Sequence, residues 1–372
     1  MTSPLRVVLA GGGTAGHVSP LLAMADAIRA EHPDAEITVV GTAEGLEARL
    51  VPAAGYTLRT IERAPLPRRP DAAALRFPSR YLRSLRQVRE ILTDTGADVV
   101  VGVGGYVCTP VYRLARKAGI PVVVHEANAR AGLANRVGAK HAAVVGTAFD
   151  GTGLPGARRV GMPMRAGIAR LDRAAARAAA REAFGLEQDA PTLLVTGGSL
   201  GALSLNRALT GALPALSAAG VQVLHVTGAG KTVTGEDGEA LSAPGYHQVE
   251  YVDGMESAYA AADLVLCRSG AGTVCEVAAV GLPSVLVPLP IGNGEQRLNA
   301  EGLVEAGGAL TVADAELSPA WLEEHVLPLL TDAAALQGMS AAAAGYGVRD
   351  AAEVMAGLIV DAAGRRAGEE TA

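Results

Sequence analysis

The sequence predicts an α/β protein with two Rossmann-like parallel-sheet domains that face a central cleft. Two glycine-rich turns carry this prediction: residues 11–17 (GGGTAGH) follow the apolar run 7–10, and residues 197–202 (GGSLGA) follow the apolar run 193–196. Each turn opens a stretch of helical character, and glycine there lets the backbone approach a phosphate in front of the first N–H groups of the helix. A chain of 372 residues is also too long for one ordinary core and fits two domains.

Short apolar runs alternate with stretches long enough to be helices, which is the pattern of βαβ units in a parallel sheet. In the first half we expect buried strands over residues 7–10, 37–40, 57–61, 98–101, 122–125 and 143–145. The pattern restarts in the second half, with strands over residues 192–196, 221–226, 248–252, 264–267 and 284–287. An alanine- and arginine-rich helix after Asp172 begins the second domain.

The stretch from Gly156 to Pro163 separates the two halves, and its run Gly161-Met162-Pro163 predicts a hinge. We therefore expect an N-terminal domain over residues 1–163 and a second domain over residues 164–345. The remaining segment, 346–372, contains an apolar helix over residues 351–363 that we expect to pack back on the N-terminal domain.

Composition excludes several classes of protein. Hydrophobic residues make up 49% and charged residues 19% of the chain, which permits large cores and excludes disorder. A net charge of −6 argues against nucleic-acid binding. Cys108, Cys267 and Cys275 form no CxxC pair and have no histidine at zinc-ligand spacing, so we expect small buried residues in a reducing compartment. The N-terminus does not resemble a signal peptide, and no apolar run approaches the roughly 18 residues of a membrane span, so we expect a cytosolic protein with at most peripheral membrane contact.

Two motifs are decoys. Gly11, Gly13 and Gly16 match the dinucleotide fingerprint GxGxxG, but that fingerprint needs an acid at the end of the second strand, and residues 39–42 (VVGT) contain none. Residues 228–232 (GAGKT) end like a P-loop, but its first glycine would fall at His225. An NAD-dependent oxidoreductase is therefore a weak alternative.

The densest set of chemically useful residues lies at 267–276 (CRSGAGTVCE), after a predicted strand and at the start of a helix. The helix N-terminus suits a phosphate, and Glu276 one turn later suits ribose hydroxyls. Alternatively, Glu276 only complements the helix dipole. After the next strand, Gln296 and Asn299 are candidates to read sugar hydroxyls.

Several motifs occur in a fixed order along nearly the whole chain: residues 12–17 (GGTAGH), 103–106 (VGGY), 125–128 (HEAN), 131–135 (AGLAN), 197–199 (GGS), 267–276 and 296–300 (QRLNA). In this order they resemble the MurG family of N-acetylglucosaminyltransferases. The resemblance implies the two-domain GT-B fold and inverting transfer of GlcNAc from UDP-GlcNAc to the C4 hydroxyl of MurNAc-pentapeptide pyrophosphoryl-undecaprenol, the lipid I to lipid II step of peptidoglycan synthesis. A related GT-B transferase with a different acceptor and a catalytically silent envelope-assembly scaffold remain alternatives, although intact His17, Glu276 and Gln296 argue against the scaffold.

The resemblance also implies site roles. UDP would lie mainly on the second domain and the lipid acceptor on the first. Glu276 would hold the ribose, and the backbone of Val252 would pair with uracil. The remaining donor positions, which are implied to contact the diphosphate, the GlcNAc or the hinge side of the nucleotide, are Ser199, Ala271, Gly272, Thr273, Asn128, Gln296 and Arg165. Two groups are implied at the junction with the acceptor's pyrophosphate: the donor-binding positions Thr14, Ala15 and Gly16, and the acceptor-binding positions Gly104, Gly105 and Tyr106.

Four positions depart from the family pattern. Ala15 replaces a glycine, Ala127 and Leu200 each replace a glutamine, and Met162 replaces an asparagine. Leu200 removes a polar group beside the donor phosphates, which leaves open a specialised paralogue.

Inversion at a sugar carbon is a single displacement that needs a base for the incoming hydroxyl and stabilisation of the departing diphosphate. A histidine near its reference pKa is a good base, and His17 is the first candidate and His125 the second. The alternatives are a structural or N-cap hydrogen bond for His17 and orientation of a loop for His125. Helix N-termini and an arginine stabilise negative charge, and the sequence contains no Asp-x-Asp motif for Mg²⁺, so we expect neither a metal nor a cofactor.

Residues 63–89 contain eight arginines and one acid, Asp71, in an otherwise acidic chain. On a helix from about residue 79, we expect Tyr81, Leu82, Leu85 and Val88 on one face, with Arg76, Arg80 and Arg83 opposite. An apolar loop beside a basic face is typical of peripheral binding to an anionic membrane, here its cytoplasmic side. The alternative is a solvated helix that packs its apolar face on its own domain.

Overall fold

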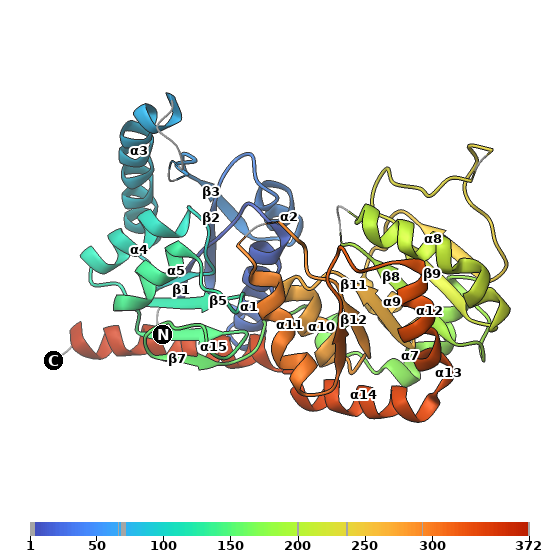
Figure 1. Cartoon of the computed structure of the whole chain (residues 1–372). Helices are drawn as coiled ribbons and strands as arrows, with labels where there is room; N and C mark the ends of the chain where they lie inside the picture. Colours follow the sequence, from blue (N-terminus) through green and yellow to red (C-terminus); the bar gives the residue numbers. More distant parts are fainter. Residues whose placement is uncertain are drawn as a thin grey trace. The chain divides into compact units, whose positions relative to one another are not determined.

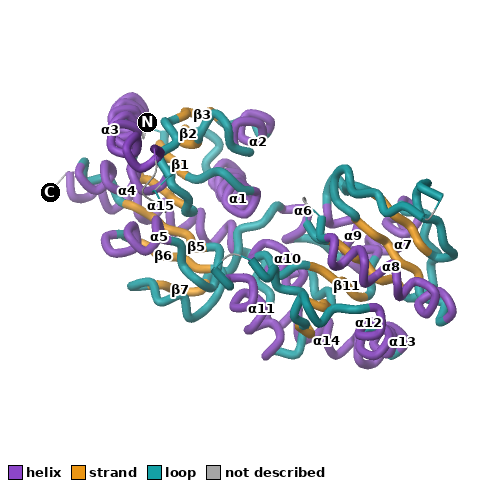
Figure 2. Tube along the Cα trace, turned by 45° about the horizontal axis from the view of Figure 1, so that its top comes forward, coloured by secondary structure: helices purple, strands orange, loops and turns teal. Residues whose placement is uncertain are grey.

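Figure 1 shows the computed structural model, which describes residues 4–65, 67, 72–198, 201–235, 237–291 and 293–370. Contacts divide the chain into two compact units. The first comprises Met1–Arg165 with Arg349–Ala372, and the second comprises Ala166–Val348. Over the described residues each unit has one parallel sheet, of seven strands in the first and six in the second, with helices packed around the strands (Figure 2).

The first sheet has the strand order β3-β2-β1-β4-β5-β6-β7. Its strands are β1 Arg6–Ala10, β2 Glu36–Gly41, β3 Thr57–Thr60, β4 Val99–Gly102, β5 Val122–Glu126, β6 Val144–Thr147 and β7 Ala157–Arg159. Every residue of β4 and β5 is buried, which explains their valine-rich sequence, because a parallel sheet covered on both faces buries both rows of side chains. The strand order reverses between β1 and β4, and ligands of such sheets bind beyond the carboxyl ends of the strands at this point.

The helices of the first unit are α1 Ala15–Glu31, α2 Glu47–Ala53, α3 Ala72–Thr95, α4 Cys108–Lys117, α5 Leu133–Gly138 and α15 Ala351–Glu370, with a 3-10 turn η1 at Ala139–His141. The C-terminal helix α15 packs against α1, and its Met355 and Ile359 join the core that contains Val7 and Leu9 (Figure 1). The last helix of the chain therefore completes the core of the first unit.

The second sheet has the order β10-β9-β8-β11-β12-β13, with its reversal between β8 and β11. Its strands are β8 Thr192–Thr196, β9 Gln222–Val226, β10 Tyr246–Val249, β11 Leu264–Cys267, β12 Ser284–Leu286 and β13 Ala309–Thr311. Its helices are α6 Ala166–Ala169, α7 Arg173–Ala183, α8 Leu203–Ala218, α9 Met255–Ala261, α10 Ala271–Ala279, α11 Glu295–Glu305, α12 Pro319–His325, α13 Leu327–Thr331 and α14 Ala333–Tyr346. As expected, α7 begins after Asp172, whose side chain accepts a hydrogen bond from the Ala175 N–H and caps the helix.

The structure corrects three sequence expectations. Edge strands β7 and β13 were not predicted, because each has only three residues and neither forms an apolar run. Strand β10 ends at Val249 rather than at position 252, because its partner β9 ends opposite it at Val226. Part of the expected linker after Gly156 is strand β7, which pairs with β6.

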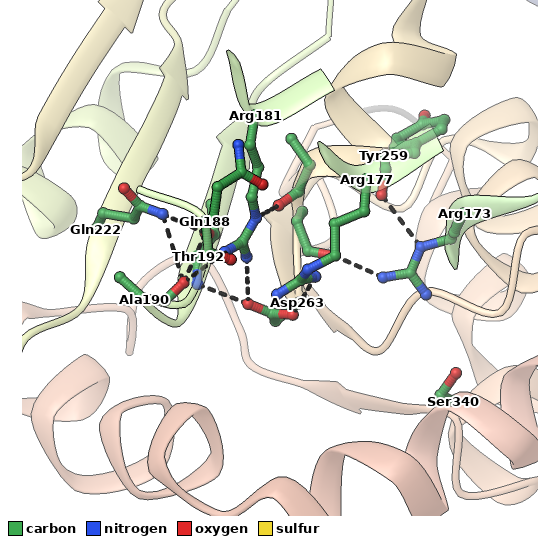
Figure 3. Close-up of polar contacts among 12 residues, drawn as sticks. Arg173, Arg177, Arg181, Gln188, Ala190, Thr192, Gln222, Tyr259, Asp263 and Ser340 are labelled. Carbon is green, nitrogen blue, oxygen red and sulfur yellow. Dashed lines mark hydrogen bonds and ion pairs between the residues drawn. The ribbon is translucent and has the colours of Figure 1, made fainter. Parts of the chain in front are cut away.

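An arginine cluster on α7 fixes this helix to the second sheet (Figure 3). The Asp263 carboxylate accepts hydrogen bonds from Arg177 (2.6 Å) and from Arg181 (2.9 Å), and also from the Thr192 N–H (2.8 Å). Arg181 is fully buried, and its guanidinium donates further bonds to the carbonyls of Glu187, Gln188, Ala190 and Ala261. The cluster therefore joins α7 to the start of β8 and to the residue that precedes β11.

Candidate active site

The first glycine turn is held by a buried carboxylate that the sequence did not reveal. Glu47, the first residue of α2, accepts hydrogen bonds from the Gly13 N–H and from the N–H and hydroxyl of Thr42, each at 2.8 Å. Burial raises the pKa of the Glu47 carboxyl, but these hydrogen bonds outweigh burial and lower it below its usual value. An internal carboxylate thus binds an N–H of the turn that a dinucleotide phosphate would need, which weakens the oxidoreductase alternative further.

His17 lies in the first turn of α1, with Nδ1 at 3.2 Å from the Thr14 hydroxyl. The loop after β4 approaches the other ring nitrogen closely, since a Cβ built at Gly104 would lie 3.2 Å from His17 Nε2. Gly104 also has a φ of +102°, so glycine is required there. Burial lowers the pKa of His17, and the charge of Glu126 partly opposes this shift. His17 is therefore a neutral imidazole at neutral pH, the protonation state that a general base needs.

Glu126 organises the loop that follows β5. This carboxylate is buried and accepts hydrogen bonds from the Asn128 N–H (2.9 Å), the Gly132 N–H (3.0 Å) and the Asn135 side-chain amide (2.9 Å). The backbone of the donor candidate Asn128 is thus held in place by its hydrogen bond to Glu126. Ala127 beside it is buried, which fits an apolar residue at that departure from the family pattern.

His125 is fully buried, and its Nε2 donates a hydrogen bond to the Gly161 carbonyl at 2.9 Å. Burial lowers the pKa of His125 to about 4. This arrangement favours the loop-orienting alternative, because a ring without exposed surface has no access to a sugar hydroxyl.

The second unit contains a matching buried histidine. His225 donates from Nε2 to Asn206 Oδ1 (3.1 Å) and accepts at Nδ1 from the Tyr246 hydroxyl (2.8 Å). Burial lowers the pKa of His225 to about 4. Each unit therefore keeps one neutral histidine in its interior.

Because of these two buried histidines, we expect both units to lose stability against unfolding at acid pH. Between pH 6.5 and about 4 the unfolded chain binds a proton at each histidine that the folded unit does not bind, so the free energy of unfolding decreases as the pH falls. At pH 4 the free energy of unfolding of each structural unit should be lower by about 3 kcal/mol, because a difference of one in pKa corresponds to roughly 1.4 kcal/mol. Urea unfolding from pH 7 to 4.5 measures it, with fluorescence of the only tryptophan, Trp321, reporting the second unit and circular dichroism reporting both. A His225→Gln variant should flatten the pH dependence of the second unit alone, and a flat profile in the native protein would contradict the prediction.

Tyr106 lies at the carboxyl edge of the first sheet beside Gly104 and Gly105, and its ring is partly exposed. Arg63 donates to the Tyr106 hydroxyl at 3.2 Å, with its guanidinium carbon 5.5 Å from the ring centre. The donor candidates Thr14, Ala15 and Gly16, which were predicted at the junction with the acceptor, are exposed at the start of α1 on the same edge. The first unit thus brings His17 together with the residues predicted to contact the acceptor.

Helix α3 projects from the first unit (Figure 1). It exposes two leucines, Leu75 (85% exposed) and Leu82 (58% exposed). Tyr81, Leu82, Leu85 and Val88 were expected on one face, but Leu82 is exposed whereas Val88 is buried. Leu82 lies about 100° around the helix from Tyr81 and therefore at the margin of that face. Arg83 and Arg80 lie 3.2 and 3.7 Å from Glu62 Oε1, whereas Arg76 is exposed. Arg68, Arg69 and Asp71 lie outside the described residues. No single helix in the described ranges is long and apolar enough to cross a membrane; one bent pair, Pro319–Thr331 with Ala333–Gly364, meets the requirement in two pieces.

In the second unit, α10 begins directly after β11, with Gly270 as its N-cap and Ala271, Gly272 and Thr273 in its first turn. These first N–H groups have no carbonyl partner within the helix, so they can bind an anion. Glu276 lies one turn further, where its Oε2 accepts a hydrogen bond of 2.8 Å from the Tyr259 hydroxyl. The predicted phosphate and ribose residues are thus one turn apart. Ser199 and Leu200 lie outside the described residues.

Gln296 is in the first turn of α11, and its Oε1 accepts from the Leu289 N–H (3.0 Å), which orients its amide at the edge beyond β12. Asn299 does not read a sugar: it is fully buried and its amide points to the Ser269 carbonyl at 3.4 Å. Val252 is buried beside the exposed Tyr251 in the loop after β10. At the end of the first unit's N-terminal segment, Arg165 is exposed and Met162 is buried.

A polar triad that the sequence did not reveal lies directly after β11, at the carboxyl edge of the second sheet. Arg268 forms a 2.6 Å ion pair with Asp314 and donates to the Ser204 hydroxyl at 2.8 Å, and Ser204 donates to Asp314 at 2.6 Å. The triad ties the residue after β11 to the first turn of α8. All three cysteines are buried, as predicted.

Two family models match the chain: the glycosyltransferase family 28 N-terminal domain over residues 7–147 and the family 28 C-terminal domain over residues 192–355. The chain is 62% identical to a protein of Paenarthrobacter aurescens (strain TC1) over 97% of each chain, and 51% identical to one of Streptomyces coelicolor over 98% of this chain and 100% of the other. Both relatives are named UDP-N-acetylglucosamine–N-acetylmuramyl-(pentapeptide) pyrophosphoryl-undecaprenol N-acetylglucosamine transferase. Among solved structures, Acinetobacter baumannii MurG matches with a TM-score of 0.79 and 29% identity, over 96% of this chain and 100% of that one. Together with the two parallel sheets, these matches confirm the predicted GT-B fold class.

Proposed function

The chain belongs to family 28 of the glycosyltransferases, and we propose that it transfers GlcNAc from UDP-GlcNAc to the C4 hydroxyl of MurNAc-pentapeptide pyrophosphoryl-undecaprenol. The observation that carries this proposal is the 62% identity, over 97% of the chain, to a relative with that named activity. The product is the lipid II intermediate of peptidoglycan synthesis, and the protein thereby contributes to cell shape and cell division.

The donor binds the second unit in this proposal. The first turn of α10 holds the diphosphate, Glu276 holds the ribose, and the loop that contains Val252 takes the uracil. Gln296, held by the Leu289 N–H, presents its amide to the GlcNAc hydroxyls. The acceptor binds the first unit at the glycine turn and at Gly104, Gly105 and Tyr106.

The reaction is a single displacement. His17 removes the proton from the acceptor O4 as the bond from O4 to the anomeric carbon forms and the bond from that carbon to the UDP oxygen breaks. UDP leaves with the electron pair, and the anomeric configuration inverts. Helix N–H groups and the exposed Arg165 stabilise the charge that develops on the diphosphate.

The test is turnover of radiolabelled UDP-GlcNAc on a short-chain MurNAc-pentapeptide pyrophosphoryl lipid, with UDP-GalNAc and other nucleotide sugars as controls. We expect transfer from UDP-GlcNAc only. Binding of UDP without transfer to this acceptor would favour a different acceptor, and binding of neither substrate would favour the silent scaffold.

The protein acts at the cytoplasmic side of the cell membrane in this proposal, as a peripheral protein on an anionic surface. The support is α3, which exposes Leu75, the adjacent Arg76 and, seven residues after Leu75 along the helix, Leu82. Apolar side chains enter the acyl boundary, and each arginine near an anionic leaflet contributes about 1 kcal/mol. The lipid tail of the acceptor stays in the bilayer, so a membrane-facing helix on the acceptor unit brings the enzyme to its substrate.

The variant Leu75→Ser/Leu82→Ser/Arg76→Glu should lower binding to anionic vesicles by at least about tenfold. It leaves Arg80 and Arg83 in place, because their contacts with Glu62 also hold α3 to its own unit. Transfer to the full-length lipid in bilayers should fall with vesicle binding, whereas transfer to a water-soluble acceptor should stay within about twofold. Arg49→Glu on α2, another exposed arginine of the same unit, is the charge-matched control. Equal loss on both acceptors would mean that α3 serves folding or the acceptor site instead.

A further inference from the structure

Tyr259 contacts the proposed ribose carboxylate, Glu276, from the protein interior, although no motif of the sequence points to it. It lies on α9, is almost fully buried, and its hydroxyl donates a 2.8 Å hydrogen bond to Glu276 Oε2. Glu276 itself is only partly buried, so its carboxylate lies between the interior and the ligand side of α10. One oxygen of the proposed ribose carboxylate is therefore anchored from the protein interior.

A second set of contacts fixes the helices that carry this pair. Arg173 donates to the carbonyls of Tyr259 (3.1 Å) and Ala262 (2.6 Å) at the end of α9 (Figure 3). The same guanidinium donates to the Gly281 carbonyl (2.7 Å), two residues after α10 ends. The half-buried Arg173 side chain thus bonds to the carboxyl ends of both α9 and α10, and the Tyr259–Glu276 bond connects the same two helices.

We infer that Tyr259 is a positioning residue of the donor site, which orients the Glu276 carboxylate toward the ribose of a nucleoside diphosphate and so sets selectivity for ribose over 2′-deoxyribose. The inference rests on the proposed function. A carboxylate has about four lone-pair sites, so it can accept from the Tyr259 hydroxyl and from ribose hydroxyls together. A glutamate side chain has several rotatable bonds, and fixing one orientation before binding improves affinity for the ligand that uses it.

The test compares UDP with 2′-deoxy-UDP by calorimetry on the full chain. The native protein should bind UDP more tightly than 2′-deoxy-UDP by at least about tenfold, because the 2′-hydroxyl donates to a charged acceptor. Tyr259→Phe keeps the ring and removes only the hydroxyl. It should weaken UDP about five- to tenfold and leave 2′-deoxy-UDP within about twofold, so that the ratio of the two dissociation constants approaches one.

Two further variants separate positioning from packing. Tyr246→Phe removes the hydroxyl of another buried tyrosine in the same unit, one that bonds His225, and should leave both dissociation constants unchanged. In a Glu276→Gln background, Tyr259→Phe should change UDP affinity by less than about twofold, because the oriented charge is already absent. Thermal unfolding followed by Trp321 fluorescence checks that each variant is folded.

An unchanged ratio in Tyr259→Phe would overturn the inference, whether both dissociation constants stay constant or rise together. Full additivity of Tyr259→Phe with Glu276→Gln would overturn it as well. A native protein that binds UDP and transfers GlcNAc while Tyr259→Phe behaves like it would refute only the role of Tyr259. A native protein that binds no UDP would refute the proposed function and this inference together.

Discussion

Replacing His17 with alanine should lower kcat for GlcNAc transfer by about 10²–10⁴, with the dissociation constant of UDP within about twofold of the native value. His17 lies in the unit proposed to bind the acceptor, and the Glu276 and α10 contacts of the donor belong to the other unit. The variant therefore removes the base and leaves the donor residues unchanged.

The pH profile tests the same role. Burial lowers the pKa of His17, and only the neutral ring accepts a proton. The native kcat/KM should therefore stay constant from pH 8 down to about 6.5 and decrease as the pH falls through the lowered pKa. His17→Ala should lose this acid limb, whereas a variant that only disturbs packing would keep it.

The measurement uses a water-soluble acceptor, so that membrane binding does not enter the rate. His32→Ala is the matched control, because His32 is the C-cap at the far end of the same helix α1. We expect it to retain the native kcat within about twofold. A His17→Ala enzyme with nearly native kcat would reject the base assignment and would reopen the question for His125 despite its burial.

The fold and the outline of the site were predictable because they depend on local patterns. The glycine turns after β1 and β8 each require residues that allow close backbone approach, and the valine-rich strands require burial on both faces. These turns end at the strand-order reversal of each sheet, where parallel sheets bind ligands. Local sequence therefore sufficed to predict that His17, Gly104 and Glu276 follow the carboxyl ends of β1, β4 and β11; their roles stay predictions.

The residues that hold these groups were not predictable, because they come from distant parts of the chain. Glu47 binds the Gly13 N–H across 34 positions, and Asp314 binds Arg268 from a loop that no motif identifies. Tyr259 lies in the alanine-rich helix α9, where no motif connects it with Glu276, yet its hydroxyl donates to that carboxylate. Such partners are brought together only by the tertiary fold, and the periodicity and spacing of the sequence carry no information about them.

The arginines of α7 show the same limitation at the opposite edge of the second sheet. The sequence indicated a helix with arginines at positions 173, 177 and 181, four residues apart, which is also the spacing of a solvated face. In the structure Arg181 is fully buried against Asp263 (Figure 3). Burial lowers the pKa of the Arg181 guanidinium, and the carboxylate of Asp263 opposes that shift. The charge of Arg181 therefore depends on Asp263 for compensation.

Replacing Asp263 with alanine should lower the free energy of unfolding of the second unit by about 3–5 kcal/mol, because it leaves a buried guanidinium without its counter-charge and the Thr192 N–H without its acceptor. Urea unfolding followed by Trp321 fluorescence measures this unit selectively. Glu301→Ala removes an ion pair with Arg297 that is exposed to solvent and should change the same free energy by less than about 0.5 kcal/mol. Asp263→Asn keeps acceptor capacity for Thr192 and should fall between the two. Equal small effects of all three substitutions would mean that Arg181 is compensated by its carbonyl partners alone, since four carbonyls already accept its N–H groups.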